Sequence, residues 1–218
     1  MQLPATRYAY QCQFINAYGQ ILERELKEAR PIVMKAVQKI NEQIKHLNAL
    51  IASLLDTSKI KTGKLVLDQE VFELCSLVRE QAESYSMTQT SHKIKITHGA
   101  DCMVFADKVR TASVIVNLLS NAVKYSPEAE EAVITVAIEE KNSVRVSVQD
   151  FGLWVPAGEQ HKLFQRFGRT DSIKKSKIPG TGLGLHLSAE IIKLEGGTIG
   201  FSSEEGKGSI FYFILPLY

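Results

Sequence analysis

The stretch Gly180-Thr-Gly-Leu-Gly-Leu185 decides the fold expected for this chain. Three glycines within five residues let the backbone approach a ligand closely. The apolar pattern of residues 187 to 194 predicts a helix directly behind them, whose first N–H groups and positive dipole end can meet an anion. The spacing matches neither the dinucleotide fingerprint nor the Walker loop, and a run of this kind, taken alone, is equally typical of a mobile loop.

A predicted helix over residues 107 to 126 carries the next polar cluster. Asn117, Asn121 and Lys124 follow one another at i, i+4 and i+7, so they share one face. Carboxamide oxygens suit magnesium, and a lysine one turn further can meet a phosphate. The segment by itself also fits an ordinary polar face in contact with solvent.

A predicted strand over residues 143 to 149 alternates apolar and polar positions and ends at Asp150-Phe-Gly152. A carboxylate there can accept a hydrogen bond from an amino group such as that of adenine, although the same residues fit an ordinary turn. The segment Leu163-Phe-Gln-Arg-Phe-Gly-Arg169 then supplies two aromatic and two basic side chains. The polar, basic residues 170 to 177 are interpreted either as a lid or as a solvated loop.

These four segments, in this order over residues 102 to 195, resemble the asparagine, Asp-x-Gly, Phe and glycine boxes of the ATP-binding catalytic domain of sensor histidine kinases. The similarity extends through the closing segment 204 to 216. It implies an α+β chain whose catalytic part is an α/β sandwich of the gyrase, histidine kinase and MutL type. In such a sandwich a mixed sheet is covered on one face by helices, and ATP lies between helices and lid.

The resemblance also implies a role for each site residue. Asp150 accepts from the adenine amino group, Asn117 and Asn121 hold Mg2+, Lys124 and the glycine-loop amides meet the phosphates, and Tyr125 lines the base pocket. The implied ATP-binding residues are Asn117, Asn121, Lys124, Tyr125, Asp150, Gly152, Arg166, Gly180, Thr181, Gly182, Leu183 and Gly184. One residue departs from the family pattern: Trp154 stands where a second glycine is expected, and it either narrows the adenine pocket or stacks on the ring.

The first sixty residues have heptad spacing of apolar residues, which predicts two helices interrupted before Pro31. We expect residues 1–63 to form an antiparallel hairpin that pairs with a second copy in a four-helix bundle, and residues 64–218 to form the catalytic domain. The expected assembly is therefore a homodimer. The alternative is a bundle within one chain, packed on the catalytic domain.

The hairpin resembles the dimerisation and histidine-phosphotransfer domain of these kinases, but its phosphoacceptor box does not match. Thr6 stands where the histidine belongs, Arg7 where an acid belongs, and Tyr10 where a small polar residue belongs. A threonine hydroxyl is a poor nucleophile without a base, so no catalytic residue is assigned. The histidines of the chain all lie outside a matching motif; they are His46, His92, His98, His161 and His186.

Composition sets the remaining expectations. With 26 basic and 24 acidic residues the net charge is +2, which gives no nucleic-acid signature. No apolar run is long enough for a membrane helix, and the three cysteines lack metal-ligand spacing, so we expect a cytoplasmic protein with reduced thiols. By resemblance, the partner is the receiver domain of a response regulator.

The sequence therefore predicts a histidine protein kinase core of a two-component system that binds Mg-ATP but lacks its phosphoacceptor. Two alternatives remain at this stage. One is a degenerate or engineered kinase that acts as a dimeric, nucleotide-binding interaction module. The other is an ATPase of the wider superfamily, although Asn117 stands where those enzymes carry a water-activating glutamate.

Overall fold

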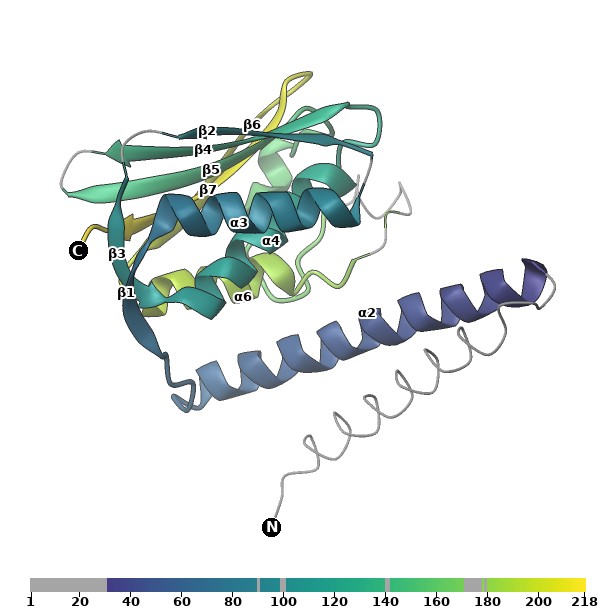
Figure 1. Cartoon of the computed structure of the whole chain (residues 1–218), viewed down its shortest axis with the longest axis horizontal. Coiled ribbons are helices and arrows are strands. Elements are labelled where there is room, and N and C mark those ends of the chain that lie inside the picture. Colours follow the sequence, from purple (N-terminus) through teal and green to yellow (C-terminus); the bar gives the residue numbers. More distant parts are fainter. Residues whose placement is uncertain (1–30, 90, 99–100, 140–141, 171–177, 179) are drawn as a thin grey trace, which may run out of the picture. The chain divides into compact units, whose positions relative to one another are not determined.

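Two units make up the chain, residues 1–65 and residues 66–218 (Figure 1). The computed structural model describes residues 31–218 except 90, 99–100, 140–141, 171–177 and 179. The first predicted helix, and with it Thr6 and the four-helix bundle, lies outside the described residues, as does nearly all of the expected lid.

Helix α2 (Pro31–Lys61) is the described element of the first unit. Its first described residue is Pro31, and proline is well tolerated in a helix's first turn because it has no N–H to leave unsatisfied. It ends in a glycine-dependent cap at Gly63, where φ is 63°. The N–H of Gly63 donates to the carbonyl of Ile60 and that of Lys64 to the carbonyl of Lys59, at 3.0 and 2.8 Å.

The second unit is built on a five-stranded mixed sheet with strand order β2-β4-β5-β7-β6. The strands are β2 (Lys93–His98), β4 (Glu131–Glu139), β5 (Ser143–Asp150), β6 (Thr198–Glu204) and β7 (Gly208–Pro216). β2 runs parallel to β4 and all other neighbours are antiparallel. The alternation predicted for residues 143 to 149 is confirmed, since Val144, Val146 and Val148 are buried in β5 while their neighbours are not.

Helices α3 (Leu74–Thr88), α4 (Lys108–Lys124) and α6 (Gly184–Leu194) cover one face of this sheet (Figure 1). The predicted sandwich with helices on one face is therefore confirmed. A short two-stranded sheet of β1 (Gln69–Glu73) and β3 (Met103–Asp107) precedes α3 and α4, and a 3-10 helix, η1 (Ala157–Lys162), follows β5. The largest fully buried side chains come from both layers and include Leu74, Ile115, Leu118, Leu119, Ile134, Ile192, Phe213 and Leu215.

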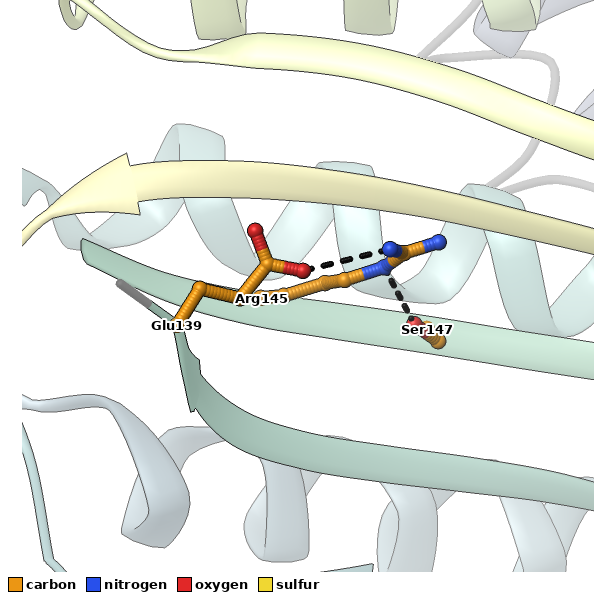
Figure 2. A network of polar contacts seen from close by, with 3 residues as sticks. All are labelled: Glu139, Arg145 and Ser147. Carbon is orange, nitrogen blue, oxygen red and sulfur yellow. Dashed lines mark hydrogen bonds and ion pairs between the residues drawn. The ribbon is translucent and has the colours of Figure 1, made fainter. Parts of the chain in front are cut away.

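The other face of the sheet carries a network of polar contacts centred on Arg145 (Figure 2). Its guanidinium donates to Glu139 at 3.2 Å and to Ser147 at 3.1 Å, and it lies 3.6 Å from the ring centroid of Tyr212. The Tyr212 ring in turn lies against Gly200, where an added Cβ would come within 2.5 Å of the phenol oxygen. Side chains of β4, β5 and β7 thus hold one another on this face.

A buried carboxylate joins the end of α6 to the start of α4. Glu195, only 5% exposed, accepts hydrogen bonds from the backbone N–H of Asp107 at 3.2 Å and the hydroxyl of Thr111 at 3.3 Å. Burial raises the pKa of Glu195 to about 7, although these hydrogen bonds oppose the shift. Asp107 itself caps α4 by accepting from the N–H of Arg110 at 3.0 Å. This junction fixes the two helices that carry the candidate site.

Candidate functional site

Asn117 of α4 lies against Gly184, the first residue of α6. The side-chain amide of Asn117 donates to the hydroxyl of Ser188 at 2.9 Å. Its Oδ1 lies so close to Gly184 that an added Cβ there would come within 2.3 Å. A larger residue at Gly184 would therefore require the Asn117 side chain to move. The expectation that a helix starts at the end of the glycine run is confirmed.

The C-terminal end of α4 meets the beginning of the glycine run. An added Cβ at Gly180 would lie 2.6 Å from Nζ of Lys124 and 3.5 Å from the hydroxyl oxygen of Tyr125. The Lys124 ammonium lies 4.9 Å from the centroid of the Tyr125 ring. Burial lowers the pKa of Lys124, and the charge of Arg169 lowers it further. Two cations therefore lie close to one glycine, an arrangement that an anion would stabilise.

Arg169, which the sequence did not single out as an ATP-binding residue, also lies at the candidate site. Its Nη1 donates to the carbonyl of Gly180 at 3.1 Å and its Nη2 to the carbonyl of Ile178, while its buried Nε finds no acceptor within the described part of the chain. The predicted residue Arg166 is instead exposed, with its guanidinium 4.9 Å from the centroid of the Phe167 ring. Both arginines belong to the same box in the sequence. Phe167, which lies between them, has a left-handed backbone with φ of 61°, and we attribute the different environments of the two side chains to this turn.

The middle of the glycine run packs against the Phe box. Gly182 has φ of 69°, and an added Cβ would lie 2.7 Å from the carbonyl carbon of Phe167. A side chain at this position is excluded both by the backbone conformation and by contact with the Phe167 backbone. Next to it, the N–H of Leu183 donates to the hydroxyl of Thr181 at 3.2 Å, and the Leu183 side chain is buried.

Asp150 ends β5 with its carboxylate only 2% exposed. Its Oδ1 accepts from the N–H of Gly152 at 3.0 Å. Burial raises the pKa of Asp150 to about 6, even though hydrogen bonds from the backbones of Gly152 and Ser209 lower it. A carboxylate this buried is stabilised by a further hydrogen-bond donor, such as an amino group of a ligand.

The turn after Asp150 is tied to the end of α4. An added Cβ at Gly152 would lie 2.1 Å from the carbonyl oxygen of Tyr125, and the N–H of Leu153 donates to that oxygen at 3.0 Å. This contact brings Asp150, predicted from one segment, close to Tyr125 and Lys124, predicted from another. Trp154, two residues beyond Gly152, keeps 40% of its surface exposed.

The histidines that the structure describes lie in varied settings. His92 is buried, with Nε2 2.8 Å from the carbonyl oxygen of Ser126 and Nδ1 3.0 Å from the hydroxyl of Ser91. His186 places Nδ1 3.1 Å from the carbonyl oxygen of Phe164. His46 belongs to α2, His98 to β2 and the exposed His161 to η1. His92 thus has both ring nitrogens engaged and is not available as an acceptor of phosphate.

Residues 106–218 match the family of histidine kinase-, DNA gyrase B- and HSP90-like ATPases, and the chain belongs to this family. Curated relatives include the sensor histidine kinase WalK of Bacillus subtilis, 29% identical over 93% of this chain, and the sensor protein GacS of Pseudomonas syringae, 32% identical over 82%. This chain spans 34% of the former and 20% of the latter.

Solved structures of histidine kinases have the same fold. Full-length ShkA in complex with AMPPNP superposes with a TM-score of 0.77, covering 98% of this chain and 44% of that one at 24% identity. The catalytic domain of the histidine kinase ThkA, at 29% identity, has a TM-score of 0.57 over 69% of this chain and 96% of that one.

The second unit is therefore an ATP-binding catalytic domain of the histidine kinase type, and the chain is homologous to sensor kinases. The helices of the described residues include none that is both long and apolar enough to cross a membrane.

Proposed function

We propose that this chain is the core of a histidine kinase that binds Mg-ATP in the site described above. The observation that carries the proposal is that Lys124 and Arg169 lie together at Gly180. Tyr125, which directly follows Lys124 at the end of α4, contacts the turn after Asp150. One helix end thus joins a region suited to phosphates and a region suited to a base. Full-length ShkA, with the same fold, was solved with the ATP analogue AMPPNP.

Asp150 is the proposed acceptor for the adenine amino group. Its Oδ1 is held by Gly152, which fixes the direction of the carboxylate at the end of β5. Because the side chain is 2% exposed, water compensates little of its charge, and a bound amino group supplies the missing donor. Tyr125, whose pKa is raised by burial, is the proposed wall of the base pocket.

Lys124, Arg169 and the glycine run form the proposed phosphate end. The two basic side chains repel each other, and a phosphate between them would remove that cost. The run ends in the N-terminus of α6, which adds backbone N–H groups and the positive end of the helix dipole. The buried Nε of Arg169 offers one more donor for a phosphate oxygen.

Asn117 and Asn121 are the proposed magnesium ligands, and the chemistry of these residues fits the ion. Their side-chain oxygens are hard donors on one face of α4. The bond from Asn117 to Ser188 uses the amide nitrogen and leaves the oxygen turned towards Gly184. Bound magnesium neutralises phosphate charge during phosphoryl transfer.

Replacing Asn121 by alanine tests this assignment. We expect ATP affinity in the presence of Mg2+ to fall at least about 10-fold, because a metal ligand is lost, while the affinity in EDTA stays unchanged. Isothermal titration calorimetry in the two buffers measures both values. Ser113→Ala, an exposed change on the same helix, is the matched control. An equal loss in both buffers would show that Asn121 contacts the nucleotide rather than the metal.

The proposed kinase core is a homodimer formed through residues 5 to 58. Four apolar residues of α2 at seven-residue spacing remain 38 to 57% exposed within one chain; they are Val33, Ile40, Leu47 and Leu54. A stripe of this spacing is typical of a helix that packs on a partner helix. The sensor kinase relatives support a receiver domain of a response regulator as the further partner.

Light scattering is expected to give about twice the chain mass of 24.3 kDa. Replacing Ile44 and Leu47 together by lysine should dissociate the dimer and leave residues 65 to 218 folded, because the changes bury charge only in the proposed bundle. Gln43→Lys, an exposed change on α2, serves as the control for added charge. A monomeric parent protein at micromolar concentration would contradict the dimer.

A further inference from the structure

Cys75 and Cys102 are 27 positions apart in the sequence but touch in the fold. Their sulfur atoms lie 3.7 Å apart, and each residue is only 3% exposed. Cys75 lies in the first turn of α3, and Cys102 directly precedes β3. Neither thiol takes part in a disulfide. The proposed nucleotide site uses neither of them.

The backbone around the two thiols is held firmly. The N–H of Leu74 donates to the carbonyl of Cys102 at 3.0 Å, and Glu73 pairs with Met103 in the β1–β3 register. Oε1 of Glu73 accepts from the N–H of Cys75 at 2.8 Å and from that of Cys102 at 3.3 Å. The same carboxylate thus binds both cysteine backbones, which keeps the two sulfur atoms in contact.

This cluster also has the composition of a metal site, because one atom each of Glu73, Cys75 and Cys102 lie within 4.8 Å of one another. The carboxylate, however, is already engaged. Oε1 accepts from two N–H groups, and Oε2 accepts from the N–H of Ser76. A cation would have to displace these bonds at the positive end of α3. The geometry therefore favours chemistry between the two sulfur atoms over coordination.

We propose that Cys75 and Cys102 form a redox pair that a small-molecule disulfide converts into an intramolecular disulfide. The thiolate of one cysteine attacks a sulfur of the reagent, RSSR, to form a mixed disulfide and release RS−, which takes up a proton. The thiolate of the second cysteine then attacks the protein sulfur of the mixed disulfide and releases the second RSH. The protein loses two protons and two electrons, and RSSR is reduced to two RSH.

Burial controls the rate of this exchange. It raises the pKa of Cys75 to about 12 and also raises the pKa of Cys102, so thiolate is scarce in the folded protein. The exchange is therefore expected to be slow in the native state and is best measured at equilibrium. The new bond would close a loop that contains α3 and β2, which restricts the unfolded chain and stabilises the fold.

The test uses the full chain with Cys12→Ser, so that only this pair remains. The protein is unfolded, refolded in buffers with increasing ratios of oxidised to reduced glutathione, and analysed by intact mass and by thiol titration in denaturant. We expect both thiols to disappear together, with the mass of two hydrogens lost and no glutathione retained. The melting temperature should rise by roughly 5 to 10 °C and return to its starting value with dithiothreitol.

Cys12→Ser combined with Cys102→Ala is the matched control, which can form only a mixed disulfide and should show no such rise. If this control fails to fold, the intact mass of the Cys12→Ser protein decides the outcome by itself. Two titratable thiols at the most oxidising ratio would overturn the proposal, as would glutathione that remains attached. If the thiols are protected from titration and EDTA removes this protection, the cluster is assigned to a metal ion instead.

Discussion

Replacing Asp150 by asparagine is expected to weaken ATP binding by about 10- to 150-fold, which corresponds to roughly 1.5 to 3 kcal/mol. The amide keeps one acceptor oxygen but loses the charge, and it turns a donor towards the adenine amino group. Because Asp150 is 2% exposed, water cannot compensate for the lost bond. Isothermal titration calorimetry with ATP measures the change.

The pH dependence of binding provides a second readout of the same residue. Since burial raises the pKa of Asp150 to about 6, the carboxylate becomes protonated as the pH falls through that value. ATP affinity of the parent protein should therefore fall between pH 8 and pH 5 by more than it does in the Asp150→Asn protein, which has no carboxylate to titrate there. The ATP phosphates titrate equally in both experiments, so the comparison isolates Asp150.

Asp68→Asn is the matched control, because Asp68 is exposed and outside the proposed site. Thermal denaturation of both variants checks that the fold survives. Unchanged ATP affinity in a folded Asp150→Asn protein would mean that adenine binds elsewhere in the chain.

The purified protein is expected to bind Mg-ATP and yet to form no phosphohistidine. The reason is the family resemblance of the sequence, which places Thr6, Arg7 and Tyr10 where the nucleophile, the neighbouring acid and the phosphatase residue are expected. Phosphoryl transfer depends on positioning an acceptor near the nucleotide, so an intact pocket without an acceptor gives no product in cis. Mass spectrometry under alkaline conditions, which preserves phosphohistidine, measures this.

Restoring the family residues tests the explanation directly. A protein with Thr6→His and Arg7→Glu should become phosphorylated only if Trp154 leaves the base pocket open, so the same protein with Trp154→Gly added is the informative companion. Trp154 is the only tryptophan of the chain and is 40% exposed, so its fluorescence also reports on ATP binding in the parent protein. Phosphohistidine in the unaltered chain, for instance at His46, would show that the acceptor is displaced rather than lost.

Steady release of phosphate from ATP, without any phosphoprotein, would instead favour the ATPase alternative. Mg-ATP binding without phosphoprotein and without turnover would favour the dimeric interaction module. These outcomes separate the three functions considered for the chain.

Local patterns in the sequence determined some of the elements of the catalytic unit. Alternation over residues 143 to 149 set a strand, and the glycine run set the beginning of α6 at Gly184. These predictions held because each depends on the conformational preferences of neighbouring residues, which the sequence displays directly. The order of the four boxes likewise indicated the family, to which residues 106–218 belong.

Tertiary structure alone decided which distant residues meet. Arg169 rather than Arg166 lies at Gly180, Glu195 accepts from the backbone of Asp107, and Cys75 touches Cys102. In the sequence, the two arginines belong to one box and the two cysteines lack any motif. Such contacts depend on the packing of separate helices and strands and on single backbone angles, such as that of Phe167. Periodicity and motif spacing carry no information about them, because they describe only residues that are neighbours along the chain.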